Sequence, residues 1–226
     1  MILSAQQISE AYRRGDIVID PFVEEQVQGA TYDLRVGEEG IATSTKKKVN
    51  IREAGYILLQ PGDFAIVIVL EEIRLGPQYA GRFGLRSKYA RKGLVATTGP
   101  QVDPGYHGRL IVGLTNLTPG AISLPYKDDF LSLEVHRLEE ATTKPYRGPY
   151  QGRVTLGPEE IEAVTEGTGM ALSEVLTTLG ALSQNVGSLT TSVATLTGEV
   201  KTLRWLMPLV TAVGIAVVAA LVALKG

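Results

Sequence analysis

Short apolar segments separated by turn residues make up the first two-thirds of the chain. Residues 64–70, Phe-Ala-Ile-Val-Ile-Val-Leu, form a continuous apolar run, which is typical of a strand buried on both faces. Turns containing Gly, Pro or Asp separate four more strand-like segments, at residues 81–85, 93–97, 109–115 and 130–138. Because these strands follow one another without intervening helices, the pattern predicts a mainly β fold, a barrel or a sandwich.

One short helix is predicted before the strands begin. Ser4 and Gln7 have the spacing of a capping box, and Ile8 and Tyr12 fall on one helical face before Gly15. The helix should therefore end at this glycine.

The last quarter of the chain follows a different period. From Leu172 to Leu203 the apolar residues recur at alternating steps of three and four, which predicts an α-helical coiled-coil stalk over residues 171–204. Val at one seam position and Leu at the other favour a dimer. Residues 153–170 then read as a linker before the stalk.

An uncharged run follows the stalk. Residues 205–224 contain no charged side chain and are flanked by Arg204 and Lys225. About 20 helical residues span roughly the 30 Å hydrocarbon core of a bilayer, and Trp205 suits the interface. We therefore expect a C-terminal transmembrane helix over residues 205–225, a single-pass anchor whose membrane partner contacts residues 205–224. With no signal peptide expected at Met1, the domain that precedes the stalk should be cytoplasmic or particle-internal.

Composition excludes several classes of function. The chain has 226 residues, a net charge of −2, no cysteine and two histidines. A near-neutral charge argues against a nucleic-acid partner, because the phosphate backbone favours basic surfaces. Without cysteine there is no disulfide framework and no His/Cys/Cys zinc site of the kind used by zinc-dependent nucleobase deaminases. We predict no protein-held metal.

Two candidate functional signals lie close together in the sequence. Residues 86–91, Arg-Ser-Lys-Tyr-Ala-Arg, combine guanidinium groups with a hydroxyl, which suits a polyphosphate. Asp103 precedes a Pro-Gly turn between apolar strands, where a carboxylate can orient an attacking water. The alternatives are a solvated rim of cations and a plain turn residue.

The region resembles the dCTP deaminase/dUTPase family. Arg86-Ser87, Ala90-Arg91 and Gly93 match the family's phosphate-binding R-S-x-x-A-R-x-G motif, and residues 103–108 match its D-x-x-Y/F-x-G motif. Further segments resemble dCTP deaminases in the same order, so that the resemblance covers residues 1–152. These segments are residues 1–4, 15–22, 32–37 and 145–152.

The resemblance implies a fold and a set of roles. It implies a dUTPase-like distorted β-barrel over residues 1–152 that assembles as a homotrimer with active sites between subunits. It assigns activation of the catalytic water to Asp103. It implies that the substrate is a deoxynucleoside triphosphate with Mg²⁺ on its phosphates, and that a set of side chains binds this substrate. That set is Arg86, Ser87, Arg91, Tyr106, and Tyr146 and Gln151 of a flexible segment that closes over the nucleotide, although a bare Gly-Pro linker is the alternative for this last segment.

Two departures from the family pattern change the expected chemistry. In the resembling deaminases a glutamate in the strand after the Asp turn activates the attacking water, and here Gly113 occupies that position. Without that general base, which typically contributes about 10²–10⁴-fold, deaminase activity should be lost. Ser132 stands where the family has a glutamine, beside Asp128 and Asp129, and acidic groups near a phosphate site are unfavourable unless a cation intervenes.

Two functional hypotheses follow from the sequence. The first is a membrane-anchored trimer that binds deoxynucleoside triphosphate and hydrolyses dUTP to dUMP and pyrophosphate. The second is a non-enzymatic scaffold that reuses the barrel, such as a structural or spike-like component of a membrane-containing virion, or a nucleotide-sensing module. A three-fold head would concentrate the strands of the stalk and favour a trimer over the dimer that the seam residues suggest.

Overall fold

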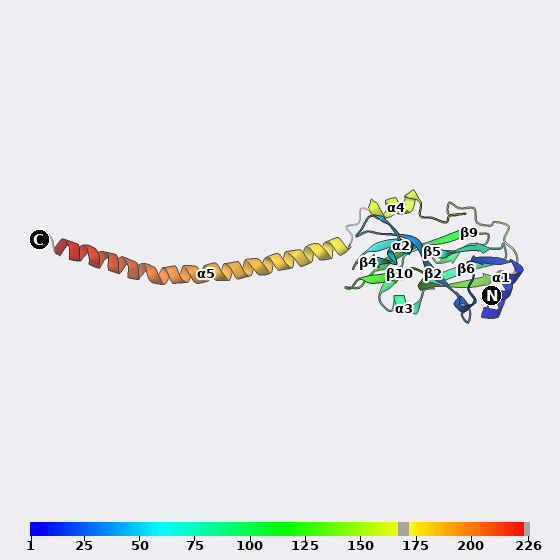
Figure 1. Cartoon of the computed structure of the whole chain (residues 1–226), viewed down its shortest axis with the longest axis horizontal. Helices are drawn as coiled ribbons and strands as arrows, with labels where there is room; N and C mark the ends of the chain where they lie inside the picture. Colours follow the sequence, from blue (N-terminus) through cyan, green and yellow to red (C-terminus); the bar gives the residue numbers. More distant parts are fainter. Residues whose placement is uncertain (167–171, 224–226) are drawn as a thin grey trace. The chain divides into compact units, whose positions relative to one another are not determined.

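The computed structural model describes the backbone of residues 1–166 and 172–223, and the side chains of residues 1–166, 178–198, 200–208 and 210–216 (Figure 1). The chain divides into two compact units, Met1–Glu174 and Val175–Gly226. In the described residues the first unit is mainly β, and the second consists of one long helix that begins at Leu172. We refer to the first unit as the head.

Short strands dominate the head, as the alternation of apolar segments and turns predicts. Its strands are β1 (Ile17–Asp20), β2 (Tyr32–Ala42), β3 (Lys48–Asn50), β4 (Tyr56–Leu59), β5 (Phe64–Leu75), β6 (Tyr79–Leu85), β7 (Leu94–Ala96), β8 (Gln101–Val102), β9 (His107–Asn116), β10 (Ile122–Pro125) and β11 (Asp129–Arg137). The helices are α1 (Ala5–Arg14), the 3₁₀ turn η1 (Glu24–Gln26), α2 (Ile51–Ala54), α3 (Ser87–Ala90) and α4 (Pro158–Thr165), and α5 (Leu172–Ala223) follows.

One antiparallel sheet organises the head. Its strand order is β7-β9-β5-β2-β11-β6-β8, with β1 added beside β5 and β3 beside β2, while β10 and β4 form a separate pair. Register shifts in β5, β2 and β11 mark irregularities of the bulge type that bend strands. In residues 1–166, β7 and β8 end the order without pairing with each other. The predicted barrel is therefore found as a mainly β half-barrel.

The central strand β5 is buried on both faces, as its continuous apolar run predicts. Ala65, Val67 and Val69 face the main core. Ile66 and Ile68 belong to a second cluster that contains Leu156 and Val164. The outer face of β5 is therefore covered by residues from the far end of the head.

Helix α4 falls within the range 153–170 that we assigned to a linker. It begins with Pro158 at its first turn and carries Glu159 and Glu160 there, which suits the positive end of the helix dipole. It contacts β5 and β2, and Figure 1 shows it over the sheet. This part of the predicted linker is therefore packed structure.

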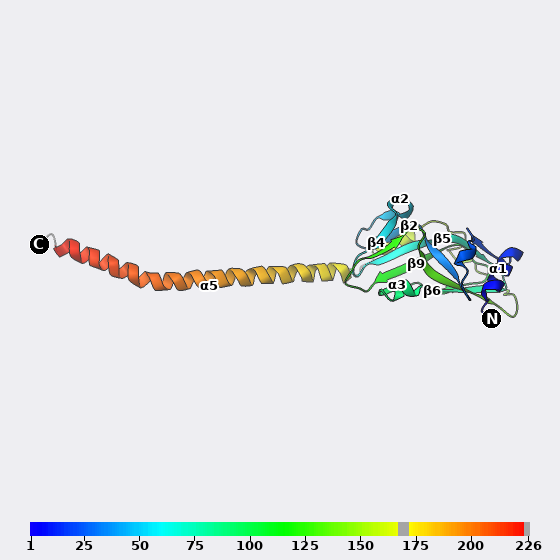
Figure 2. The ribbon, with the colours of Figure 1, turned by 60° about the horizontal axis from the view of Figure 1, so that its bottom comes forward.

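The N-terminal helix agrees with its capping signals. Ser4 caps α1 in a capping box in which its backbone N–H donates to Oε1 of Gln7 at 3.0 Å. Gly15 ends the helix in the left-handed conformation, with φ of 76°. In Figure 2, α2 lies beside β2 and β4, with which it is in contact.

Helix α5 bears out the helical part of the predicted stalk. The eight heptad residues whose side chains are described, from Leu179 to Leu203, are 54–64% exposed. Their apolar stripe has no covering partner within the described part of this one chain. Association of several such helices into a coiled coil therefore stays a prediction.

The transmembrane prediction for residues 205–225 is not borne out. Among the described residues, no helix is both long enough and apolar enough to cross a membrane. Within the uncharged run 205–224, the side chains of residues 209 and 217–224 lie outside the described part.

Candidate functional site

A cavity of about 490 Å³ opens beside β9, next to the Asp103 turn. Its walls come from β5, β6, β8, β9, the loop after β7, the segment after β11, and α4. Most of the lining is apolar or aromatic. The lining includes Phe64, Phe83, Thr97, Thr98, Gln101, Asp103, Tyr106, Arg109, Ile111, Gly113, Tyr146, Tyr150 and Glu160. Such a cavity has the size and character of a small-ligand site.

Asp103 lies on a turn fixed by its neighbours. Gly105 has φ of 84°, a conformation that only glycine adopts without strain. The backbone N–H of Tyr106 donates to the carbonyl of Asp103 at 3.1 Å, and that of Gly105 to the carbonyl of Leu75, also at 3.1 Å. In the described residues no hydrogen bond engages the exposed Asp103 carboxylate. It is therefore a free acceptor at the cavity wall.

Tyr106 supplies ring surface to the cavity. It is 6% exposed, and its hydroxyl donates to the carbonyl of Arg109 at 2.9 Å. Burial raises the pKa of this hydroxyl well above its ordinary value. The ring of Tyr146 packs against it with 5.7 Å between centroids. Since the hydroxyl is already engaged, the ring face remains to contact a ligand.

The segment predicted to close over the site is docked on the Asp103 turn. The backbone N–H of Tyr146 donates to the carbonyl of Pro104 at 2.8 Å, and that of Gly152 to the carbonyl of His107 at 2.7 Å. The side-chain amide of Gln151 donates to Gly105 O at 2.9 Å and accepts from the His107 N–H at 3.1 Å. Tyr146 lines the cavity and Gln151 does not. The side chain of Gln151 bridges Gly105 and His107, and its contact with substrate stays a prediction.

Gly113 lies at the end of the cavity near Thr97 and Thr98. The backbone N–H of Gly113 donates to Oγ1 of Thr98. A Cβ atom on Gly113 would lie 2.6 Å from Oγ1 of Thr97 and 3.1 Å from Oγ1 of Thr98. The space of the missing glutamate is therefore filled by two threonines. Neither threonine was among the site residues predicted from the sequence, although the Thr pair lies between a strand and a Gly-Pro turn.

The cationic turn lies apart from this cavity. Arg86 caps α3, Ser87 begins it and Arg91 follows it. None of the three lines the cavity. The two signals that the sequence places close together are therefore not brought into one cavity within a single chain, and the expected site between subunits stays a prediction.

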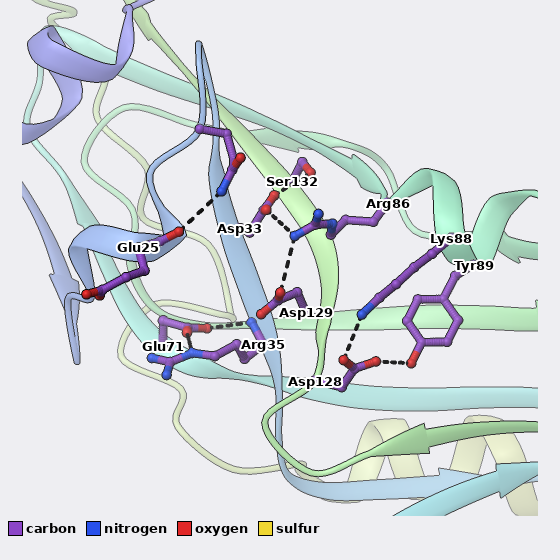
Figure 3. A network of polar contacts seen from close by, with 11 residues as sticks. Glu25, Asp33, Arg35, Glu71, Arg86, Lys88, Tyr89, Asp128, Asp129 and Ser132 are labelled. Atoms are coloured by element: carbon purple, nitrogen blue, oxygen red, sulfur yellow. Dashed lines mark hydrogen bonds and ion pairs between the residues drawn. The ribbon is translucent and has the colours of Figure 1, made fainter.

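Arg86 is held by acidic partners instead (Figure 3). Its Nη1 donates to Asp33 and, at 3.2 Å, to Asp129. Ser132, the residue at the glutamine position, donates to Asp33 at 2.7 Å. The charge of Arg86 is therefore largely offset by carboxylates that lie far from it in the sequence.

A second ion pair restrains the next cation of the turn. Lys88 donates to Asp128 at 2.7 Å, and the hydroxyl of Tyr89 donates to the same carboxylate. Burial alone would raise the pKa of Asp128, but the hydrogen bonds from Lys88 and Tyr89 outweigh burial and lower it. Ser87 and Arg91 are exposed, so they are the predicted phosphate-binding groups that remain open to a ligand.

The described residues contain no group of three or more His, Asp or Glu side chains placed to hold a metal ion. The acidic side chains nearest the cationic turn are already paired with Arg86 and Lys88. The residues present therefore do not fit a protein-held cation at that turn.

Comparison with known proteins adds to this geometry. The model of a family described as dCTP deaminase-like matches residues 2–126. A dCTP deaminase of Thermococcus sibiricus is 39% identical over 139 residues, which are 62% of this chain and 87% of the relative. A dCTP deaminase of Aquifex aeolicus described as dUMP-forming is 30% identical over 171 residues, covering 71% of this chain and 95% of the relative.

A solved structure has a similar fold. The 2′-deoxycytidine 5′-triphosphate deaminase of Agrobacterium tumefaciens superposes with a TM-score of 0.51 at 17% identity. The match covers 59% of this chain and 47% of that one. At this identity the likeness bears on the fold alone.

Proposed function

This chain belongs to the dCTP deaminase-like family, and we propose that it binds deoxynucleoside triphosphates and hydrolyses dUTP to dUMP and pyrophosphate without deaminating dCTP. One observation carries the proposal: the cavity has a free carboxylate at Asp103 and none at Gly113. The relatives, which are described as dCTP deaminases, suggest a deoxynucleoside triphosphate as the substrate. The residues of this cavity suggest hydrolysis in place of deamination.

In the proposed reaction Asp103 acts on water. A carboxylate at the cavity wall accepts a proton from a water that attacks the α-phosphorus, and the bond from that phosphorus to the bridging oxygen breaks as pyrophosphate leaves. Mg²⁺, held by the substrate's own phosphates, would offset their charge. The ring of Tyr106 and the tyrosines of the closing segment supply apolar surface for sugar and base.

Assembly completes the site in this proposal. Because Arg86, Ser87 and Arg91 lie apart from the cavity in one chain, we place the cationic turn of one subunit beside the cavity of the next in a homotrimer. The exposed heptad stripe of α5 gives the same subunits a second shared apolar surface. Cross-linking of the full chain in solution tests this part: a ladder that ends at dimer would contradict it.

A second candidate function rests on a separate observation. Asp33 and Asp129 already engage Arg86, which favours a non-enzymatic scaffold whose phosphate site is weakened. This alternative predicts weak or absent triphosphate binding.

Product analysis separates these functions. The full chain is incubated with each dNTP and dUTP in the presence of Mg²⁺, and the nucleotides are separated by chromatography. We expect dUMP and pyrophosphate from dUTP, and no uracil nucleotide from dCTP. Deamination of dCTP would refute the assignment of Gly113, and binding of no nucleotide would favour the scaffold.

A further inference from the structure

The segment over the cavity, Tyr146–Gly152, continues into a close contact with β9. The backbone N–H of Arg109 donates to the carbonyl of Arg153 at 2.8 Å. Gly108, with φ of 137°, lets the chains approach, since a Cβ atom there would lie 2.7 Å from the Arg153 carbonyl oxygen. Together with the bond from Gly152 to His107, this contact fastens the end of the closing segment to the strand that carries the site.

The side chain of Arg153 then ties the segment to α4. Its Nε donates to the carbonyl of Pro149 at 3.0 Å, and its guanidinium carbon lies 5.1 Å from the centre of the Tyr150 ring. Its Nη1 donates to both carboxylate oxygens of Glu160, at 2.7 Å and 3.0 Å. Arg153 therefore joins the backbone and an aromatic ring of the closing segment to Glu160 of α4.

Glu160, the partner of Arg153, is buried and makes a second hydrogen bond. Its side chain is 6% exposed, and it also accepts from the Gly157 N–H at 2.7 Å. Leu156 and Val164, on either side of it in the sequence, are buried against the outer face of the sheet. A carboxylate so buried and so bonded is costly to leave without its cation.

We infer that Glu160 is a positioning residue for the nucleotide site, which acts through Arg153 to hold Tyr146 and Tyr150 over the cavity before any nucleotide binds. This inference rests on the proposed function, since it assigns the held segment to nucleotide binding. A segment ordered in advance loses less conformational freedom when the ligand arrives, so binding is tighter. Because Arg153 offsets the charge of Glu160, the carboxylate can lie at the cavity wall without repelling a triphosphate.

The test compares two neighbouring substitutions in the full chain. Glu160→Gln keeps the shape and an acceptor for Gly157 but removes the charge that holds Arg153. Glu159→Gln is the matched control, because Glu159 contacts the same arginine at 3.3 Å but is 68% exposed. Exposed pairs of this kind contribute little.

Two readouts are measured for each variant. The first is hydrogen exchange, without nucleotide, at the amides of Arg109 and Gly152. The second is the change in KM and kcat for dUTP. For Glu160→Gln we expect the exchange rates and KM each to rise by about tenfold, because the loss of one charge-assisted hydrogen bond has an effect of about this size. The kcat should change by less than about twofold. Glu159→Gln should change neither.

Each outcome has a definite meaning. Unchanged exchange in Glu160→Gln overturns the inference, and so does faster exchange with an unchanged KM. Faster exchange throughout β5 in Glu160→Gln would report a general loss of stability. In that case Arg153→Lys, which keeps the cation but loses the paired donors, is measured in place of Glu160→Gln. If the wild type hydrolyses no nucleotide, the proposed function fails, while the exchange comparison still shows whether Glu160 holds the segment.

Discussion

Truncation of Leu156 tests whether the chain beyond residue 152 is part of the head. Leu156 is 4% exposed and packs with Ile41, Ile66 and Ile68. Replacing a buried leucine by alanine typically costs about 2–5 kcal/mol, because transfer free energy is lost and a cavity remains. Since Leu156 belongs to the smaller of the two buried clusters, we expect Leu156→Ala to lower the free energy of unfolding of the head by about 2–3 kcal/mol.

The assay must report on the head and not on α5. All nine tyrosines lie between residues 12 and 150, and the one tryptophan is Trp205 in α5. Urea unfolding is therefore followed by the near-ultraviolet signal of tyrosine. Val154→Ala is the control, because Val154 is 42% exposed and should cost less than about 0.5 kcal/mol. Equal urea midpoints for Leu156→Ala and the control would refute the packing of α4 as a part of the head.

Three further substitutions test the site and its surroundings. Gly113→Glu should not produce dCTP deamination, because the added side chain meets Thr97 at 2.6 Å; uracil nucleotide above background would contradict this. Asp128→Asn should weaken the acid dependence of stability: a lowered pKa gives stability that is complete above the carboxyl's unfolded pKa of 3.8 and is lost as pH falls through the folded value. Urea midpoints measured across this pH range would contradict the prediction if they fell equally in the variant and in the wild type. Gly105→Ala should cost at least about 1 kcal/mol, because φ is positive there; an unchanged urea midpoint would show that the turn tolerates a side chain.

Local patterns predicted the elements that depend on neighbours in the sequence. The capping signals of Ser4 and Gly15 gave the bounds of α1, because a helix end is satisfied by residues within a few positions. The apolar run of β5 indicated burial on both faces, and the Pro-Gly turn placed Asp103 and Tyr106 at one cavity.

Contacts between distant residues were not visible in the same way. The partners of Arg86 are Asp33 and Asp129, which are 53 and 43 positions away, and no periodicity reports such a pairing. Pro158 and the acidic residues after it are typical of a helix start, but only the fold shows that Leu156 and Val164 cover β5. For the same reason the sequence did not identify Glu160 at the cavity.

The measurement that tests the central claim most directly compares wild type and Asp103→Asn in dUTP turnover and binding. Calorimetric titration with a non-hydrolysable dUTP analogue gives the affinity, and pyrophosphate release gives the rate. If Asp103 acts as the base, the variant should lose at least about 100-fold in kcat while its Kd changes by less than about threefold. Undiminished turnover by Asp103→Asn, or a wild type that neither binds nor hydrolyses dUTP, would contradict the account.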